Sequence, residues 1–305
     1  AAMVKELREM TGAGMMDCKK ALNETNGNMD EAVEFLRKNG QAKAEKKASR
    51  IAAEGLCMVV TKDDQTAAVV EVNSETDFVA KNATFQEFVK AVATQAVNSD
   101  AADMDAFMAE KWNEDASKTV SEALVEKVAV IGENLKIRRF EKVVAEHGCV
   151  VPYVHGGGRI GVIVDADTDV VNDTVKEAMH NIAMQIAALN PKYVSRDEVS
   201  ADYIAHEKEI LLAQIMNDPK ESQKPEKVIN GMIEGRISKE LKEVCLVDQV
   251  YVKAEDGKQT VAKYLEEVSK AVGGTVKVKR FVRFETGEGL EKKQEDFAAE
   301  VAAQM

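Results

Sequence analysis

Residues 73–81, Asn-Ser-Glu-Thr-Asp-Phe-Val-Ala-Lys, place an aromatic side chain next to a carboxylate between two regular elements. A phenylalanine with a neighbouring acid suits a contact that wedges into a partner protein. Phe78 and Asp77 are therefore the first candidates for function. The same residues leave a structural alternative open, in which Phe78 is a core residue at the start of a helix and Asp77 caps that helix.

The flanks of this segment are regular. Residues 67–73 predict a strand, and residues 82–97 place Phe85, Phe88, Val89 and Val92 at helical spacing. The segment is thus a short loop held by two rigid elements. Loops that a rigid scaffold positions carry function disproportionately often.

Composition limits the classes of protein to consider. The chain has 305 residues, which is enough for two or three domains, and its 45% hydrophobic content supports real cores. A net charge of −12 disfavours general nucleic-acid binding, because phosphate contacts need clustered cations. No apolar run approaches 18 residues, and the N-terminus lacks a charged-then-apolar secretion pattern. We expect a cytoplasmic protein that does not enter a membrane.

The N-terminal region predicts a small helical module at residues 1–40. Its helices are expected at residues 4–10, 15–23 and 29–38, with Gly40 as the C-cap of the last one. Residues 41–54 follow as a linker, helical or flexible, because residues 41–50 carry four cations and no large apolar side chain. A module of this size buries little surface and is marginally stable alone.

The rest of the chain predicts an α+β fold. The expected strands are 56–61, 67–73, 135–144, 150–154, 159–165, 244–252 and 276–285. The expected helices are 80–97, 103–113, 117–131, 170–189, two polar helices within 196–241 that break near Pro219, 260–272 and 294–304.

Two segments repeat in type. Residues 131–140 match residues 272–281 at most positions, and residues 76–79 have a counterpart in residues 168–171. This pattern predicts a duplicated core with subdomains at 55–145 and at 146–195 with 242–286, an inserted helical arm at 196–241 and a C-terminal module at 287–305. The second copy has Val170 where the first has Phe78, which favours a special role for Phe78.

Motifs for catalysis are missing. The chain has no phosphate-binding loop, no dinucleotide fingerprint, no His-Glu-x-x-His and no Gly-x-Ser-x-Gly, so we expect neither an enzyme nor a cofactor. His147, Cys149 and His155 lack a fourth ligand and fit no common metal spacing. The glycines at 156–158 favour a hairpin turn over a phosphate cradle, because no helix follows them. The four scattered cysteines are expected to be reduced thiols.

Four stretches carry a resemblance to a known family. They are residues 4–22, Val-Lys-Glu-Leu-Arg-Glu-Met-Thr-Gly-Ala-Gly-Met-Met-Asp-Cys-Lys-Lys-Ala-Leu; residues 76–81, Thr-Asp-Phe-Val-Ala-Lys; residues 155–162; and residues 280–289. In this order they resemble bacterial elongation factor Ts, the guanine-nucleotide exchange factor for elongation factor Tu. The resemblance runs the whole length of the chain.

The resemblance implies roles for individual residues. Thr76, Asp77, Phe78 and Val79 would intrude beside the magnesium site of elongation factor Tu, displacing the ion and disturbing the phosphate site. The N-terminal module would be a bundle of the ubiquitin-associated type, and in some members the helical arm makes a contact between two copies.

The resemblance implies docking roles as well. Arg8, Met15 and Met16 would pack on the partner's nucleotide-binding domain, and His155 would touch the partner near its phosphate-binding region. Without the resemblance, the two methionines could equally fill a small core.

Two other functions remain open at this stage. The chain could be a non-catalytic adaptor that binds a helical partner through the three-helix module. It could also bind RNA through residues 41–50 and 277–283, although the acidic net charge counts against this.

Overall fold

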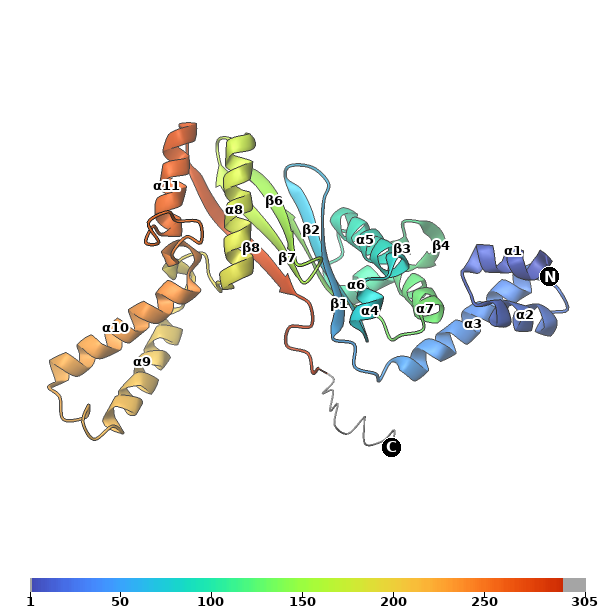
Figure 1. The fold of residues 1–305 in the computed structure, drawn as a ribbon, viewed down its shortest axis with the longest axis horizontal. Helices are drawn as coiled ribbons and strands as arrows, with labels where there is room; N and C mark the ends of the chain where they lie inside the picture. Colours follow the sequence, from blue (N-terminus) through green and yellow to red (C-terminus); the bar gives the residue numbers. More distant parts are fainter. Residues whose placement is uncertain (1, 293–305) are drawn as a thin grey trace.

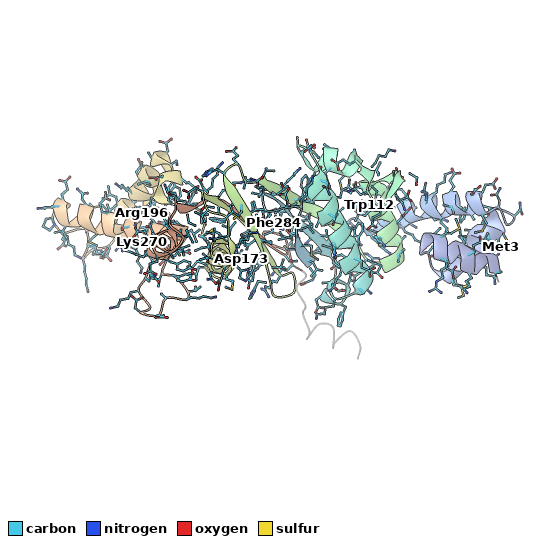
Figure 2. The ribbon with its side chains drawn as sticks, turned by 90° about the horizontal axis from the view of Figure 1, so that it is seen from above. Met3, Trp112, Asp173, Arg196, Lys270 and Phe284 are labelled. Atoms are coloured by element: carbon cyan, nitrogen blue, oxygen red, sulfur yellow. The ribbon has the colours of Figure 1, made fainter. Side chains whose placement is uncertain are left out.

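A computed structural model describes residues 2–292 as an elongated arrangement of helices around two central sheets. Helices α1 (Ala2–Thr11), α2 (Met15–Glu24) and α3 (Met29–Lys47) lie at one end of the molecule. An arm of two long helices, α9 (Ala201–Met216) and α10 (Glu226–Val244), projects at the other end (Figure 1). Figure 2 shows the same order from above, from Met3 through Trp112 and Phe284 to Arg196. Antiparallel sheets with helices on their outer faces are the arrangement of an α+β protein, as predicted.

The first sheet has the strand order β1-β2-β5 and is antiparallel throughout. Its strands are β1 (Glu54–Thr61), β2 (Thr66–Ser74) and β5 (Lys136–Val144). Helices α5 (Ala83–Asn98) and α7 (Val120–Ile131) bury their apolar faces against its outer side. Phe85, Phe88, Val89 and Val92 of α5 are all buried there, so the predicted helical spacing is confirmed.

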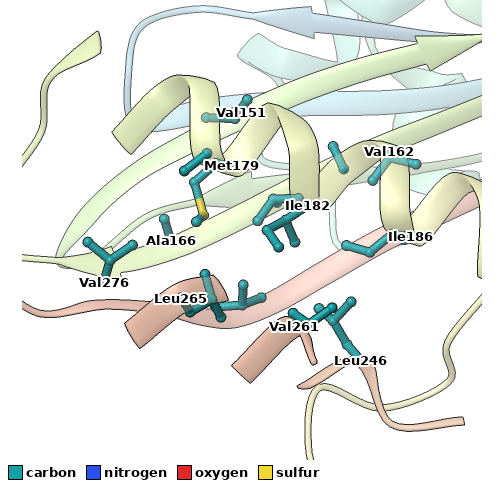
Figure 3. Close-up of a cluster of buried hydrophobic side chains, with 14 of the residues drawn as sticks. Val151, Val162, Ala166, Met179, Ile182, Ile186, Leu246, Val261, Leu265 and Val276 are labelled. Carbon is teal, nitrogen blue, oxygen red and sulfur yellow. The ribbon is translucent and has the colours of Figure 1, made fainter. Parts of the chain in front are cut away.

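The second sheet has the order β6-β7-β8 and is also antiparallel. Its elements are β6 (Gly148–His155), β7 (Ile160–Thr168) and β8 (Val276–Glu285), covered by α8 (Asp173–Leu189) and α11 (Val261–Val272). Figure 3 shows Met179, Ile182 and Ile186 of α8 and Leu265 of α11 gathered in one buried cluster with residues of the sheet. The predicted glycine turn joins β6 to β7, and all three glycines have positive φ.

The inner faces of the two sheets pack on each other. Cys57 and Val69 of the first sheet share a buried cluster with Ile163 and Phe284 of the second. The backbones approach closely, because a Cβ added to Gly161 would lie 3.0 Å from Val69 Cγ2. The central part of the molecule is thus layered helix, sheet, sheet, helix (Figure 1).

The two sheets correspond residue by residue at several points. Each central strand has a bulge directly after a buried acid, Glu71 in β2 and Asp165 in β7. Each of these acids pairs in register with an arginine, Arg139 and Arg280 respectively. Helices α7 and α11 both end at a left-handed glycine before the third strand. These correspondences support the predicted duplication, while the predicted subdomain limits stay a prediction.

The predicted pairing of residues 76–79 with residues 168–171 is wrong by two positions. The Ser74 hydroxyl donates to the Thr76 carbonyl at 2.9 Å, and the Thr168 hydroxyl donates to the Val170 carbonyl at 3.0 Å. Thr168 therefore corresponds to Ser74, and Val170 to Thr76. The sequence comparison aligned Thr76 with Thr168 because both are threonines. The residue that makes the hydrogen bond of Thr168 in the first half is a serine, Ser74.

The corrected pairing reveals an insertion. Asn82 caps α5 and Asn172 caps α8 in the same way, each accepting from the backbone N–H three residues later. Seven residues separate Ser74 from Asn82, but only three separate Thr168 from Asn172. The additional residues in the first half form the short helix α4 (Asp77–Ala80), which carries Phe78.

The N-terminal helices are α1 (Ala2–Thr11), α2 (Met15–Glu24) and α3 (Met29–Lys47). Gly40 is not the C-cap of the third helix, because α3 continues for seven residues beyond it into the predicted linker. Gly40 is buried beside α7, where an added Cβ would lie 3.6 Å from Ala129. Packing on α7 thus extends the helix. The predicted limit at residue 40 falls inside one continuous helix.

Three further expectations differ from the structure. The predicted helices 103–113 and 117–131 are shortened by a small hairpin, β3 (Lys111–Trp112) and β4 (Asp115–Thr119), after α6 (Met104–Ala109). Trp112 is 5% exposed and packs near Phe88, so core packing overrides helix propensity there. The predicted strand 244–252 is a 3-10 turn with isolated bridges instead. The predicted helix 294–304 lies outside the described residues.

The arm consists of α9 (Ala201–Met216) and α10 (Glu226–Val244), preceded by a 3-10 turn at Arg196–Glu198. It has a core of its own, in which Ile215 packs with Ile229, Ile233 and Ile237 of α10. This isoleucine row at helical spacing explains why the two largely polar helices pair.

The buried carboxylate of Glu71 joins three segments of the chain. It accepts hydrogen bonds from Arg139 Nε at 2.7 Å and from Arg138 Nη1 at 3.1 Å on β5. It also accepts from the Asn73 side chain at 2.9 Å and from the Gly287 backbone N–H at 2.7 Å, beyond the end of β8. Because Glu71 is 0% exposed, these partners replace all of its hydration.

We expect Glu71→Ala to lower the free energy of unfolding by about 3–5 kcal/mol, because it removes the buried anion that two largely buried arginines share. Urea unfolding followed by circular dichroism measures the change. The matched control is Glu141→Ala on β5, where an exposed acid faces Arg280 at 3.6 Å. That change should cost about 0–1 kcal/mol. Equal losses in the two variants would contradict a special role for the buried carboxylate.

Candidate functional site

Phe78 lies on the surface. Its side chain is 80% exposed, more than any other large hydrophobic residue in the part of the chain that the structure describes. The alternative in which it fills the core at a helix start is therefore wrong. An apolar ring with this exposure gains free energy only when another surface covers it.

The turn that carries Phe78 is held by hydrogen bonds on its N-terminal side. Thr76 caps α4, because its hydroxyl accepts from the Val79 N–H at 3.3 Å. The carboxylate of Glu133, just beyond α7, accepts from the Thr76 hydroxyl at 2.7 Å and from the Thr76 N–H at 3.1 Å. In return the Asn134 N–H donates to the Glu75 carboxylate at 2.7 Å. The exposed ring therefore projects from a fixed backbone.

Asp77 does not cap a helix, since Thr76 caps α4 and Asn82 caps α5. Its carboxylate pairs instead with Lys81 at 2.8 Å, one turn along the chain. The hydrogen bond from Lys81 lowers the pKa of Asp77 below its ordinary value, against a smaller opposing effect of desolvation. Asp77 is thus an exposed, charged neighbour of the ring.

The N-terminal module presents the other predicted apolar contacts. Met15 and Met16 begin α2 and are 60% and 74% exposed, so they do not fill the small core of this module. Arg8 is exposed on α1, and Met10 on the same helix is 61% exposed. Met residues adapt to varied partner surfaces.

His155 is exposed at the end of β6, in the other sheet from Phe78. Its Nδ1 lies 2.9 Å from the Tyr153 hydroxyl, and the Tyr153 ring packs edge-on against His180 at 5.2 Å between centroids. The predicted contact residues therefore lie on three separate parts of the fold: the N-terminal module with α1 and α2, the turn at α4, and the end of β6.

His147, Cys149 and His155 have separate surroundings in the described structure. His147 Nδ1 lies 2.7 Å from Asp167, while Cys149 is buried in the core of the second half. Within residues 2–292, no group of three or more potential metal ligands comes together. The four cysteines are free and buried, and burial raises the pKa of the Cys57 thiol to about 12. A thiol with this pKa is protonated and unreactive at neutral pH.

Over the described residues, no helix is long and apolar enough to cross a membrane.

The arm exposes apolar side chains, among them Ile210, Leu212, Met216 and Val228. Association of two copies through the arm stays a prediction.

Comparison with known proteins identifies the family. The family model described as Elongation factor TS matches residues 75–288. An elongation factor Ts from Clostridioides difficile is 53% identical over 306 aligned positions, which cover 100% of this chain and 98% of that protein. The elongation factor Ts of Clostridium novyi is 51% identical over the same shares of both chains.

The chain belongs to the elongation factor Ts family. A third relative, the elongation factor Ts of Clostridium perfringens, is 50% identical over 99% of this chain and 97% of its own length. Membership of this family assigns the protein to translation elongation in protein biosynthesis. The matched region begins at Glu75, so it includes the exposed turn, strand β5 of the first sheet and all three strands of the second sheet.

We expect Phe78→Ala to change the free energy of unfolding by less than about 0.5 kcal/mol, because an exposed ring contributes little to the folded state. The matched control is Phe85→Ala, seven residues along the chain, where the ring is 0% exposed. That change should cost about 3–5 kcal/mol. Urea unfolding of both variants measures the difference. A large loss for Phe78→Ala would show that the ring packs inside the protein.

Proposed function

We propose that this protein is the guanine-nucleotide exchange factor of elongation factor Tu and that Phe78 is the wedge that promotes GDP release. The exposed ring on a fixed turn is the observation that carries the proposal. In this mechanism, residues 76–79 intrude beside the partner's magnesium site, displacing the ion and disturbing the phosphate site. The chain itself performs no covalent step.

Linkage sets the thermodynamics of exchange. A factor that binds the nucleotide-free partner more tightly than the GDP-bound partner must weaken GDP binding by the same ratio. Each tenfold ratio corresponds to about 1.4 kcal/mol. Burial of one Phe in a well-packed pocket at a hot spot supplies roughly 2–4 kcal/mol. The wedge therefore accounts for a substantial part of the effect, and docking elsewhere supplies the rest.

Docking is assigned to the other exposed residues. Arg8, Met15 and Met16 provide a charged and apolar patch on the N-terminal module, and His155 provides a contact on the second sheet. Helix α3 supports this division, because it joins the module to α7 through a buried glycine contact and an ion pair of Arg37 with Glu126 at 3.8 Å. The module is thus held beside the first half, where α4 carries the wedge.

We expect Phe78→Ala to lower the saturating rate of GDP release by at least about tenfold and to change the half-saturating concentration by no more than about threefold, because the distant docking contacts remain. Stopped-flow release of a fluorescent GDP analogue from elongation factor Tu measures both quantities. Asp77→Asn removes a charge at nearly constant shape and should have a smaller effect. A variant Phe78→Ala with wild-type release would refute the wedge.

The same assay separates this proposal from a non-catalytic adaptor. An adaptor would bind elongation factor Tu through the three-helix module without changing the rate of GDP release. Acceleration by the wild-type chain favours an exchange factor, and binding without acceleration favours an adaptor.

We expect the double change Met15→Ala with Met16→Ala to change the half-saturating concentration and not the saturating rate, whereas Phe78→Ala mainly changes the saturating rate. Loss of two exposed contacts at a docking surface costs about 1–2 kcal/mol of binding, so the half-saturating concentration should rise about tenfold while the saturating rate stays the same. Leu189→Ala, which trims a 46% exposed residue at the end of α8, is the control. An unchanged half-saturating concentration would exclude this patch from docking.

A further inference from the structure

The carboxylate of Glu133 is directed at the turn that carries the wedge. Its Oε2 accepts from the Glu75 N–H at 3.0 Å and from the Thr76 N–H at 3.1 Å, and its Oε1 accepts from the Thr76 hydroxyl at 2.7 Å. One side chain thus fixes two consecutive peptide groups and the residue that caps α4. Hydrogen bonds to an ionised carboxylate are roughly twice as strong as bonds between neutral groups.

Glu133 itself is placed by rigid neighbours. Gly132 ends α7 in the left-handed conformation with φ of 88°, just before the chain enters β5. The next residue, Asn134, is buried, and its side chain donates to the Arg50 carbonyl at 2.8 Å. The carboxylate therefore does not have to be ordered when a partner binds.

The second half of the core provides an internal comparison. The bond of the Asn134 N–H to Glu75 recurs there, as the Thr275 N–H donates to Asp169 at 2.8 Å. At the position of Glu133 the second half has Gly274, where an added Cβ would lie 2.6 Å from Asp169 Oδ1 and from Val170 Cγ2. The second half also lacks the short helix α4.

The acid and the inserted helix thus occur together in one half and are both missing from the other. In both halves, a hydrogen bond from a backbone N–H to a carboxylate joins the chain after the helix, α7 or α11, to the residue after the central strand. This shared bond is sufficient for the connection. Glu133 is therefore not required by the fold common to the two halves.

We propose that Glu133 is a positioning residue, which holds the turn of Thr76 and Phe78 in the orientation that GDP release requires. This inference rests on the proposed function. A carboxylate that fixes the turn acts on the wedge without touching the partner. Its removal leaves every docking residue in place and lowers only the fraction of molecules whose wedge is correctly aimed.

The test is stopped-flow GDP release with the full-length chain and elongation factor Tu, using Glu133→Ala, Phe78→Ala and the variant that combines them. Glu133→Ala should lower the saturating rate about tenfold and leave the half-saturating concentration within about twofold. A misplaced wedge slows GDP release, whereas the docking contacts that set the half-saturating concentration are unchanged. In the combined variant, loss of Glu133 should slow release by less than about twofold beyond Phe78→Ala alone, since the two residues act through one element.

Two further variants act as controls. Glu133→Gln should restore most of the rate, because its amide oxygen can accept from the two N–H groups and its amide nitrogen can donate to the Thr76 hydroxyl. Glu122→Ala removes an exposed acid from the first turn of α7 and should release GDP as the wild type does. If Glu133→Ala does not fold, Glu133→Asp replaces it, since the shorter side chain keeps the charge but withdraws the carboxylate.

The outcomes separate this inference from the proposed function. If Glu133→Ala releases GDP at the wild-type rate while Phe78→Ala releases it slowly, the positioning role of Glu133 is overturned and the wedge is retained. A further tenfold loss in the combined variant would also overturn it, because Glu133 would then act independently of the wedge. Wild-type release by Phe78→Ala would overturn the wedge and this inference together.

Discussion

The buried ion cluster around Glu71 is the constraint on which the arrangement of the core depends. The acid lies on the central strand of the first sheet and binds both arginines of β5 together with the backbone N–H of Gly287. Arg139 in turn lies over the ring of Phe284 at 4.2 Å and donates to the Glu285 carbonyl. The end of β8 in the second sheet is thereby tied to the first sheet at one point.

This tie also fixes the region next to the candidate site. Gly287 has φ of 75° and packs so closely on Ala53 that an added Cβ would lie 2.3 Å from its carbonyl oxygen. Only glycine combines this backbone conformation with such an approach. Ala53 directly precedes β1, and Arg50, three residues earlier, binds Glu75 at 3.4 Å. The segment that enters the first sheet is thus anchored on both sides, which keeps the turn of Thr76 in place relative to both sheets.

Much of the architecture could be predicted because it follows from local patterns. The strand pairs of each hairpin and the helices α5, α8 and α11 lie where residue types and spacing predicted them. The exposure of Met15 and Met16 was implied only by the family resemblance, because residue types alone also fitted a small core. The departures have tertiary causes. Helix α3 continues past Gly40 because α7 packs against it, and residues 111–119 form a hairpin because Trp112 enters the core. No local pattern contains these contacts.

The candidate site shows the same division. Sequence analysis identified residues 76–79 but left open whether Phe78 is buried, because an apolar residue at the start of a helix fits either state. It also paired these residues with the wrong part of the second half. Ser74 and Thr168 make equivalent hydrogen bonds in the two halves, but they differ in residue type, so the sequence does not align them. Glu133 was not recognised as part of the site, because it lies 57 positions after Thr76 in the sequence and no local pattern indicates the contact.

The exposure of Phe78 and the rigidity of its backbone have to be considered together. An exposed aromatic ring on a flexible loop would lose conformational entropy on binding, at about 1–2 kcal/mol for each backbone residue that becomes ordered. Thr76, Glu133 and Asn134 make the ordering bonds already in the folded chain. In the proposed mechanism, the free energy of covering the ring is then available to act on elongation factor Tu. Because folding has already ordered the turn, the inserted helix α4, only four residues long, can hold Phe78 exposed in a fixed position. The second half of the core has no corresponding helix.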